Sequence, residues 1–172
     1  SYLAYIAHAV HGDDAHLVLA DSPSIPRTEV RDAIKLAIER GWKLSTVATE
    51  EFENEAFLAN TGNRCFFYKD ELFTKMDKYA QEHGISILAY GEIAEDRLDP
   101  TRLGAQAARQ HKVVAPLADA ALAKEEIRQL SRRAGLPTWD NPSFACLSSR
   151  FPVGTPVEIN EIIGRICVVL LA

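Results

Sequence analysis

The chain has 172 residues, enough for one domain with a substantial core, and its hydrophobic fraction of 47% is ordinary for a globular protein. Its formal net charge of -5 argues against a general nucleic-acid-binding surface, because phosphate contacts need clustered Lys and Arg. Three cysteines at wide spacings do not suit a disulfide framework, which favours a reducing, cytoplasmic location.

The longest apolar run is the C-terminal IIGRICVVLLA, residues 162–172. It contains Arg165 and is too short to span a bilayer, and no signal peptide opens the chain. We therefore expect no membrane association. Cys167, which lies in this run, is most simply a buried apolar residue.

The first half of the chain alternates between helical and strand-like periodicity. Apolar residues at helical spacing predict a helix over Ser1–Val10, and the short apolar run AHLVLAD predicts a buried strand over 15–21. A second helix is expected over Arg27–Glu39, and WKLSTVAT predicts the next strand over 42–49. A glycine follows each helix, at positions 12 and 41, as a stop signal.

The alternation continues in the second half, after an irregular stretch over 50–62. The expected elements are a helix over Lys69–Glu82, a strand over 85–92, a helix over Arg102–Gln110, a strand over 112–117 and a helix over Ala123–Arg133. Helices that alternate with buried strands indicate βαβ units. The sequence therefore predicts an α/β fold with a Rossmann-like parallel sheet that helices cover on both faces.

Polar residues follow three of the expected strands, where ligands bind in parallel sheets. They are Asp21-Ser22-Pro23, Thr49-Glu50, and Gly91-Glu92 with Glu95 and Asp96. Asp21 is equally suited to a turn or a helix cap. A glycine permits close backbone approach, and a carboxylate beside it can hold magnesium on a nucleotide phosphate. A solvated acidic turn is an equal alternative there.

The segment NPSFACLSSRFPVGTP, residues 141–156, carries a single thiol, Cys146, where proline disfavours a helix or a central strand. A reactive cysteine needs access and a positive neighbour, and Arg150 is a candidate for that neighbour. Arg150 is equally suited to hold a carboxylate or phosphate, or to form a surface ion pair. Local sequence leaves both a reactive and a buried structural role open for Cys146.

Three segments together resemble the ATP-dependent sacrificial sulfur transferases of nickel-pincer nucleotide synthesis, a branch of the PP-loop ATP pyrophosphatases. They are ADSPSIPRTEV (20–30), NRCFFYKDELF (63–73) and the long stretch 115–156. The resemblance implies an adenine nucleotide alpha hydrolase-like domain over 1–156, followed by an unmatched apolar tail over 157–172.

Enzymes of this family adenylylate a pyridinium carboxylate mononucleotide, release pyrophosphate and then deliver sulfur to the activated carboxylate. In the sacrificial subtype a protein cysteine supplies the sulfur and becomes dehydroalanine. The resemblance implies that Cys146 is this donor, with Ser149, Arg150 and Arg64 supporting the thiolate or binding the substrate. It implies ATP contacts at Ser1, Ala20, Asp21, Ser22, Gly91 and Lys124, and a magnesium ligand at Asp96.

The resemblance also sets the expected cofactors and partners. The expected cofactors are ATP and Mg²⁺, and the expected partner is a small-molecule pyridinium mononucleotide. We expect no binding to nucleic acid or to a membrane, and the sequence leaves open whether the protein forms a homo-oligomer. Judged from its own position, Lys124 could also stand in the first turn of a solvated helix, but a lysine is electrostatically unfavourable there, which favours the functional role.

The chain departs from the family pattern at several positions. The Ser-Gly-Gly-x-Asp-Ser loop and the first strand are missing, because Ser1 aligns at or just after the last serine of that loop. Tyr90 stands where the family has an aspartate, and Tyr68 stands where cluster-bearing members have the second cysteine of a pair that begins at Cys65. The family's C-terminal domain is not matched.

We therefore expect a fragment that lacks both ends of the enzyme and is inactive alone. A tRNA thiolase of the same superfamily and an inactive nucleotide-binding module are the alternatives.

Overall fold

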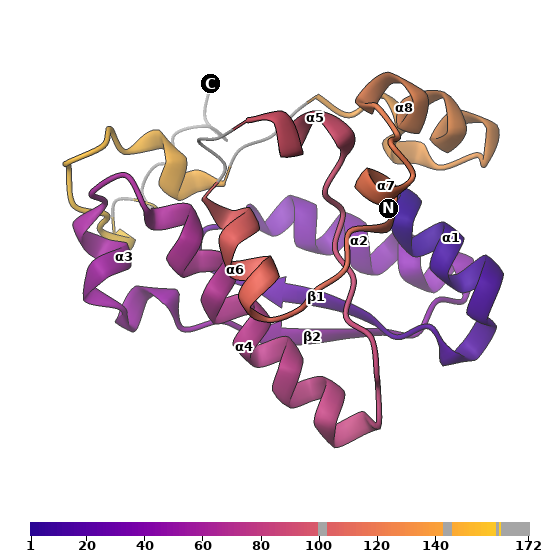
Figure 1. Cartoon of the computed structure of the whole chain (residues 1–172), viewed down its shortest axis with the longest axis horizontal. Coiled ribbons are helices and arrows are strands. Elements are labelled where there is room, and N and C mark those ends of the chain that lie inside the picture. Colours follow the sequence, from indigo (N-terminus) through magenta and orange to yellow (C-terminus); the bar gives the residue numbers. More distant parts are fainter. Residues whose placement is uncertain (100–102, 143–145, 161, 163–172) are drawn as a thin grey trace.

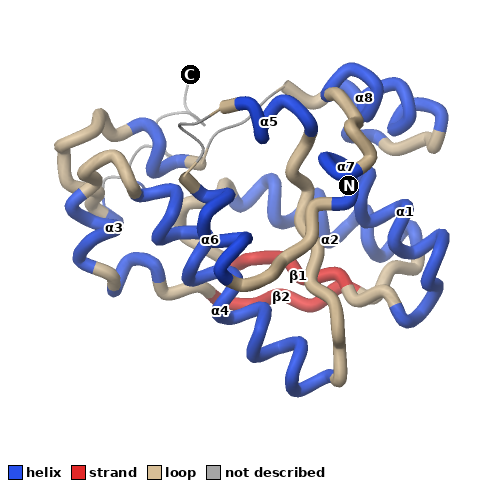
Figure 2. The backbone as a smooth tube through the Cα atoms, viewed as in Figure 1, coloured by secondary structure: helices blue, strands red, loops and turns tan. Residues whose placement is uncertain are grey.

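The computed structural model describes residues 1–99, 103–142, 146–160 and 162. Its helices are α1 (Tyr2–His11), α2 (Arg27–Arg40), α3 (Glu55–Ala59), α4 (Arg64–His83), α5 (Ala94–Leu98), α6 (Gly104–Gln110), α7 (Pro116–Asp119) and α8 (Lys124–Arg133). Its strands are β1 (Leu17–Asp21) and β2 (Leu44–Ala48). Short 3₁₀ turns are formed by Gly12–Asp14, Glu51–Glu53, Pro137–Asp140 and Leu147–Arg150. Figure 2 shows the two strands side by side at the centre, with helices around them.

The two strands pair in parallel, from Leu17 opposite Leu44 to Asp21 opposite Ala48. One face of this sheet meets the helices before and after β1, because Leu17 and Leu44 join an apolar cluster with residues of α1 and α2. The other face meets α4, where the Tyr79 hydroxyl lies 2.8 Å from Ser45 Oγ. The predicted α/β class, with a parallel sheet between helices, is confirmed.

The sequence predicts two further strands, over 85–92 and 112–117, and neither forms over its whole length, so this prediction was wrong. Within 85–92 and 112–117 the structure has one parallel bridge, between Ala89 and Val114, with hydrogen bonds from Val114 N to Leu88 O (2.9 Å) and from Tyr90 N to Val114 O (3.0 Å). The parallel pairing was therefore correct and the strand length was not. Burial on both faces sustains a central parallel strand, whereas Ile87 in this segment is 70% exposed.

The helix predicted over Lys69–Glu82 begins five residues earlier, at Arg64, after the N-cap Asn63. This extension places Arg64 on a helix, directly after the irregular stretch that we predicted over 50–62. That stretch also holds α3, whose first turn is capped by the Asn54 side chain accepting from two backbone N–H groups. Of the helix predicted over Arg102–Gln110, residues 104–110 are helical, and Arg102 lies outside the described residues.

Helices α4 and α6 pack closely because α6 begins with a glycine. A Cβ at Gly104 would lie 2.7 Å from the Lys69 side chain and 3.4 Å from the Cys65 carbonyl oxygen. Phe73 of α4 is buried against Ala107 and Ala108 of α6 in the core cluster beneath. This contact holds the first turns of α4 in place.

A separate apolar cluster lies at the carboxyl end of the sheet, where α3 and residues 146–160 meet (Figure 1). Its buried members are Phe57, Leu147, Phe151, Val157 and Ile162. Burying each of the larger side chains contributes about 2 kcal/mol, so the cluster fixes the segment after Cys146. The tail beyond Ile162, with Cys167, lies outside the described residues. Among the described residues, no helix combines the length and apolarity needed to cross a membrane.

His111 links the end of α6 to α4. Its Nδ1 lies 2.5 Å from Asp77 Oδ2, and its Nε2 lies 3.0 Å from Asp70 Oδ1. Burial lowers the pKa of His111, but the hydrogen bonds and charges of the two aspartates outweigh this effect and raise the pKa overall.

A raised folded-state pKa makes the contribution of His111 to stability depend on pH. That contribution is complete below the unfolded value of 6.5 and is lost as the pH rises through the folded value. We predict that the free energy of unfolding, measured by urea denaturation, falls as the pH rises above 6.5 and through the raised folded-state pKa of His111. His111→Gln should remove most of this fall and cost about 1 kcal/mol at low pH. The exposed His11→Gln is the control; a slope unchanged by His111→Gln would contradict the assignment.

Candidate functional site

The carboxyl end of β1 is bonded to the turn that follows Cys146. Ser24, just beyond the strand, has its Oγ 2.7 Å from Ser148 Oγ, and its carbonyl oxygen accepts from Leu147 N at 2.8 Å. Ser24 and Ser148 are fully buried. The strand end therefore fixes the turn Leu147–Arg150, although the two segments are 124 positions apart.

A buried carboxyl group supports this junction from the end of β2. Glu51 is 1% exposed, and the Ser22 hydroxyl donates to its Oε1. Ser22 Oγ in turn accepts from the backbone N–H of Ser24 at 2.9 Å. Among the described residues, Glu51 Oε2 and Thr49 Oγ1 are buried without a hydrogen-bond partner. Burial of such unpaired atoms is costly and uncommon, so each calls for an explanation.

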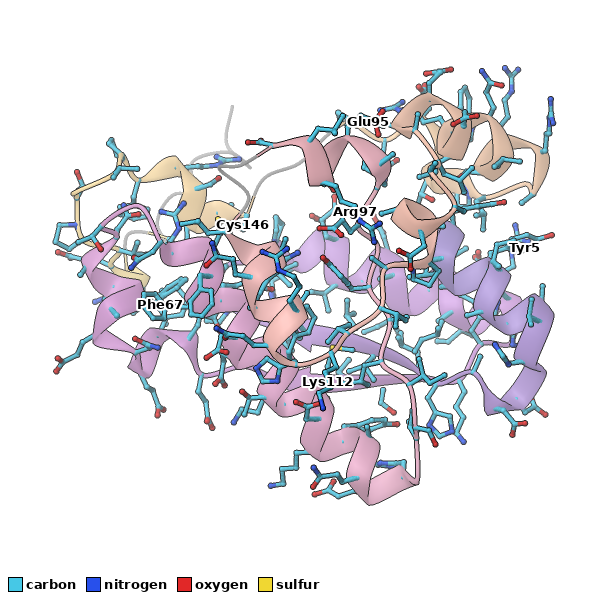
Figure 3. All side chains as sticks on the ribbon, in the orientation of Figure 1. Tyr5, Phe67, Glu95, Arg97, Lys112 and Cys146 are labelled. Atoms are coloured by element: carbon cyan, nitrogen blue, oxygen red, sulfur yellow. The ribbon has the colours of Figure 1, made fainter. Side chains whose placement is uncertain are left out.

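Cys146 is half-buried directly before this turn, at the same end of the molecule as Phe67 (Figure 3). Burial raises the pKa of the Cys146 thiol. The backbone N–H groups of Ser149 and Ser148 and the positive charge of Arg64 act in the opposite direction, since each stabilises the thiolate. The resting thiol is protonated at neutral pH, but the groups that would support its anion are in place.

Tyr68 lies within electrostatic range of both Cys146 and Glu51. Burial raises the pKa of Tyr68, and the negative charges of Glu51 and Cys146 raise it further. The phenol is therefore protonated throughout the physiological pH range. Cys65, one turn earlier on α4, is exposed.

Asn60 ties the segment after Cys146 to the α3–α4 connection. It is 1% exposed, and its Nδ2 donates to Pro152 O at 2.8 Å and Thr155 O at 2.9 Å. Its Oδ1 accepts from Arg64 Nη1 at 2.8 Å. Asn60 thus fixes both the turn and the cation that faces Cys146.

The other predicted residues near this junction have mainly local contacts. Ala20 is buried at the end of β1, and the Asp21 carboxylate forms an exposed ion pair with Arg27, consistent with the turn role that we left open. The Ser149 hydroxyl donates to the Cys146 carbonyl oxygen at 2.6 Å. Arg150 is exposed at the end of the same turn.

A second group of predicted residues surrounds α5. The backbone N–H of Lys124 donates to Glu95 Oε1 at 2.9 Å, and Asp96 accepts from the N–H of Ile93 at 3.4 Å. Magnesium is commonly held by one or two carboxylates and substrate phosphates, so Asp96 is a suitable ligand type. In the ranges that the structure describes, no group of three or more His, Cys, Asp or Glu residues could hold a metal on its own.

A cleft of about 470 Å³ lies between this acidic turn and α6. Arg97, which Figure 3 labels beside Glu95, pairs there with the buried Glu92 (3.3 Å) and with Asp119 (2.5 Å). Tyr90 lines the same cleft, with the Lys69 ammonium 4.4 Å from its ring centroid. Among the described residues, no atom lies within 4 Å of where a Cβ at Gly91 would stand, so their packing does not require glycine there.

The predicted residues thus fall into separate groups. Ser22, Cys146, Ser149 and Arg64 gather at the carboxyl ends of the strands, Lys124 and Asp96 lie around α5, and Ser1 lies against Thr138, with 2.5 Å between their hydroxyl oxygens. Sequence reasoning missed Glu51, Asn60 and Ser148. Glu51 could have been found, because it follows the selected pair Thr49-Glu50 by one residue. No local signal distinguishes Asn60.

These features define an α/β protein whose parallel strands end at a cysteine-bearing turn. No protein-family model matches the chain. It is 37% identical over 165 residues to an uncharacterised protein of Synechocystis sp. (strain ATCC 27184 / PCC 6803 / Kazusa), a match that covers 95% of this chain and 61% of that relative. It is 25% identical over 150 residues to pyridinium-3,5-bisthiocarboxylic acid mononucleotide synthase of Lactiplantibacillus plantarum, covering 87% and 54%. The chain therefore spans between about half and three-fifths of these relatives.

The role of Asn60 can be tested through stability. Asn60→Gly removes its side-chain hydrogen bonds but suits its φ of 51°, and it should lower the free energy of unfolding by about 2 kcal/mol. Asn60→Ala should cost about 1 kcal/mol more, because alanine is strained in that left-handed conformation. Urea denaturation measures both, with the exposed Thr61→Ala as control. A glycine variant as stable as the parent would rule out the anchoring role.

Proposed function

We propose that this chain is the catalytic core of an ATP-dependent sulfur transferase of nickel-pincer nucleotide synthesis, with Cys146 as the sacrificial sulfur donor. The observation that carries the proposal is the position of Cys146. It directly precedes a turn bonded to the carboxyl end of β1, where parallel sheets bind their ligands. The name of the Lactiplantibacillus relative, a synthase of a pyridinium bisthiocarboxylic acid mononucleotide, supports the same chemistry.

The groups around Cys146 suit a nucleophile that must be ionised only during reaction. Arg64 and the backbone amides of Ser148 and Ser149 stabilise the thiolate, while burial disfavours it at rest. The thiolate sulfur would attack the carbonyl carbon of the acyl-adenylate and form a C–S bond as AMP leaves. Loss of the Cα proton of Cys146 then breaks its Cβ–Sγ bond. The products are a thiocarboxylate and dehydroalanine, so atoms and electrons balance without an external oxidant or reductant.

ATP would supply the activation of the substrate carboxylate. We assign its contacts to Ser1, Ala20, Asp21, Ser22, Gly91 and Lys124, and the magnesium ligand to Asp96. The ATP phosphates would provide the remaining metal ligands. Ser22 is fully buried and its hydroxyl donates to Glu51, so it would act by holding the strand end against which the nucleotide lies.

The donor assignment predicts one turnover per chain. We expect a form of the protein that includes the Ser-Gly-Gly-x-Asp-Ser loop to lose the mass of one hydrogen sulfide molecule at Cys146 after incubation with ATP, magnesium and the pyridinium carboxylate. Peptide mapping by mass spectrometry locates the loss, and Cys65→Ala is the control that should still react. Dehydroalanine at position 65, or undiminished product from Cys146→Ala, would contradict the assignment.

The phosphate contact predicts a separate loss. In the same form of the protein, Lys124→Ala should weaken ATP binding about tenfold, the effect expected when a charged hydrogen bond is removed, and should slow pyrophosphate release. Calorimetry and a pyrophosphate assay measure the two effects, and the exposed Lys78→Ala is a charge-matched control. Unchanged affinity in Lys124→Ala would exclude the contact. Tight ATP binding without pyrophosphate release by the parent protein would favour the alternative of an inactive nucleotide-binding module.

A further inference from the structure

The buried carboxyl group of Glu51 is not explained by stability alone. Only one of its two oxygens is bonded, to the Ser22 hydroxyl, and Oε2 is buried without a partner among the described residues. An unpaired buried acceptor is destabilising, so a neutral or apolar side chain would serve folding better. Such exceptions call for a functional reason.

The bonded oxygen begins a continuous chain of contacts that ends at Ser148, two residues after Cys146. We call Ser22, Ser24 and Ser148 the serine relay, and all three are fully buried. Glu51 Oε1 accepts from Ser22, Ser22 Oγ accepts from Ser24 N at 2.9 Å, and Ser24 Oγ lies 2.7 Å from Ser148 Oγ.

The relay ends on the part of the chain that supports the sulfur. The backbone N–H of Ser149 donates to the Cys146 carbonyl oxygen at 3.0 Å, and the N–H groups of Ser149 and Ser148 also favour the Cys146 thiolate. The orientation of these amides depends on the turn Leu147–Arg150, which the relay fixes to the end of β1. A buried hydrogen-bond chain of this kind is rigid when complete and loosens when one member is removed.

We propose that Glu51 is a positioning residue for Cys146, because through the serine relay it holds the turn that directly follows the cysteine and is bonded to its carbonyl group. A role of Glu51 in catalysis rests on the proposed function of Cys146 as sulfur donor. The positioning of Cys146 by Glu51 does not depend on that function, so it can be tested without ATP or substrate.

The test is the pH dependence of alkylation of Cys146 by iodoacetamide in the intact chain. Peptide mapping reads Cys146 and the exposed Cys65 separately, so Cys65 reports any general unfolding or change of reagent. The titratable groups that act on Cys146 are Arg64, Cys65 and Tyr68 of α4, and Glu51 acts on Tyr68. Only Glu51 and the relay are varied.

Glu51 could act on Cys146 by positioning the turn or simply by its negative charge, and the two roles predict opposite shifts in the pH midpoint of Cys146 alkylation. Removing a nearby negative charge stabilises a thiolate and lowers the alkylation midpoint, whereas misplacing the amides raises it. We expect Glu51→Ala and Ser148→Ala each to raise the midpoint of Cys146 by about one pH unit, the loss of roughly one charge-assisted hydrogen bond. Glu51→Gln keeps an acceptor for Ser22 and should not raise the midpoint.

Glu53→Gln, on the exposed side of the same 3₁₀ turn, is the matched control and should change neither cysteine. A lower midpoint in both Glu51 variants would show that Glu51 acts only as a charge, and would overturn the proposal. An unchanged midpoint in Ser148→Ala, measured on protein whose thermal unfolding is cooperative, would also overturn it. If Glu51→Ala does not fold, Ser22→Ala takes its place, because it removes the contact of Glu51 with the relay and keeps the charge. It should raise the midpoint of Cys146, and an unchanged midpoint would overturn the proposal.

Discussion

The hydrogen bond between Ser24 and Ser148 is the contact on which the arrangement of the candidate site depends. It joins the end of a central strand to a turn near the other end of the described chain, with no apolar contact needed at that point. Both hydroxyls are excluded from water, so neither could be satisfied if the other were displaced. The position of Cys146 is therefore set by the end of the sheet.

The apolar cluster around Phe57 has a complementary role. It buries Leu147 and Phe151, which flank the turn, while Asn60 bonds the carbonyl groups that follow. Apolar packing is tolerant of direction, whereas hydrogen bonds are not. The cluster holds the segment in place, and the serine relay and Asn60 decide how it is oriented.

The sequence was most informative where one local rule was enough. Periodicity located α2, α8 and the two strands, and the rule for ligands at strand ends selected Ser22 and the pair before Glu51. Prediction from the sequence failed where the structure of a segment depends on a distant partner. The run over 85–92 is apolar enough for a strand, but Ile87 is exposed to solvent instead of being covered by a helix, and only Ala89 of this run forms a bridge.

The site residues that the sequence did not indicate also depend on distant partners. Glu51 lies in the charged stretch TEEFENE, which has the composition of a surface turn, and only the fold shows that Ser22 and Tyr68 lie near it. Asn60 is similar, because its value comes from carbonyl groups some 90 positions later.

The half-burial of Cys146 also bears on how long its thiol survives. Oxidation to sulfenic acid begins from the thiolate, and its rate follows the thiolate fraction and access to the oxidant. Burial keeps that fraction small and shields one side of the sulfur, whereas Cys65 stands exposed on α4. Peroxide in the surroundings would thus meet Cys65 first. For the proposed role of Cys146, this means that a sulfur atom to be given up only once would stay reduced until it reacts.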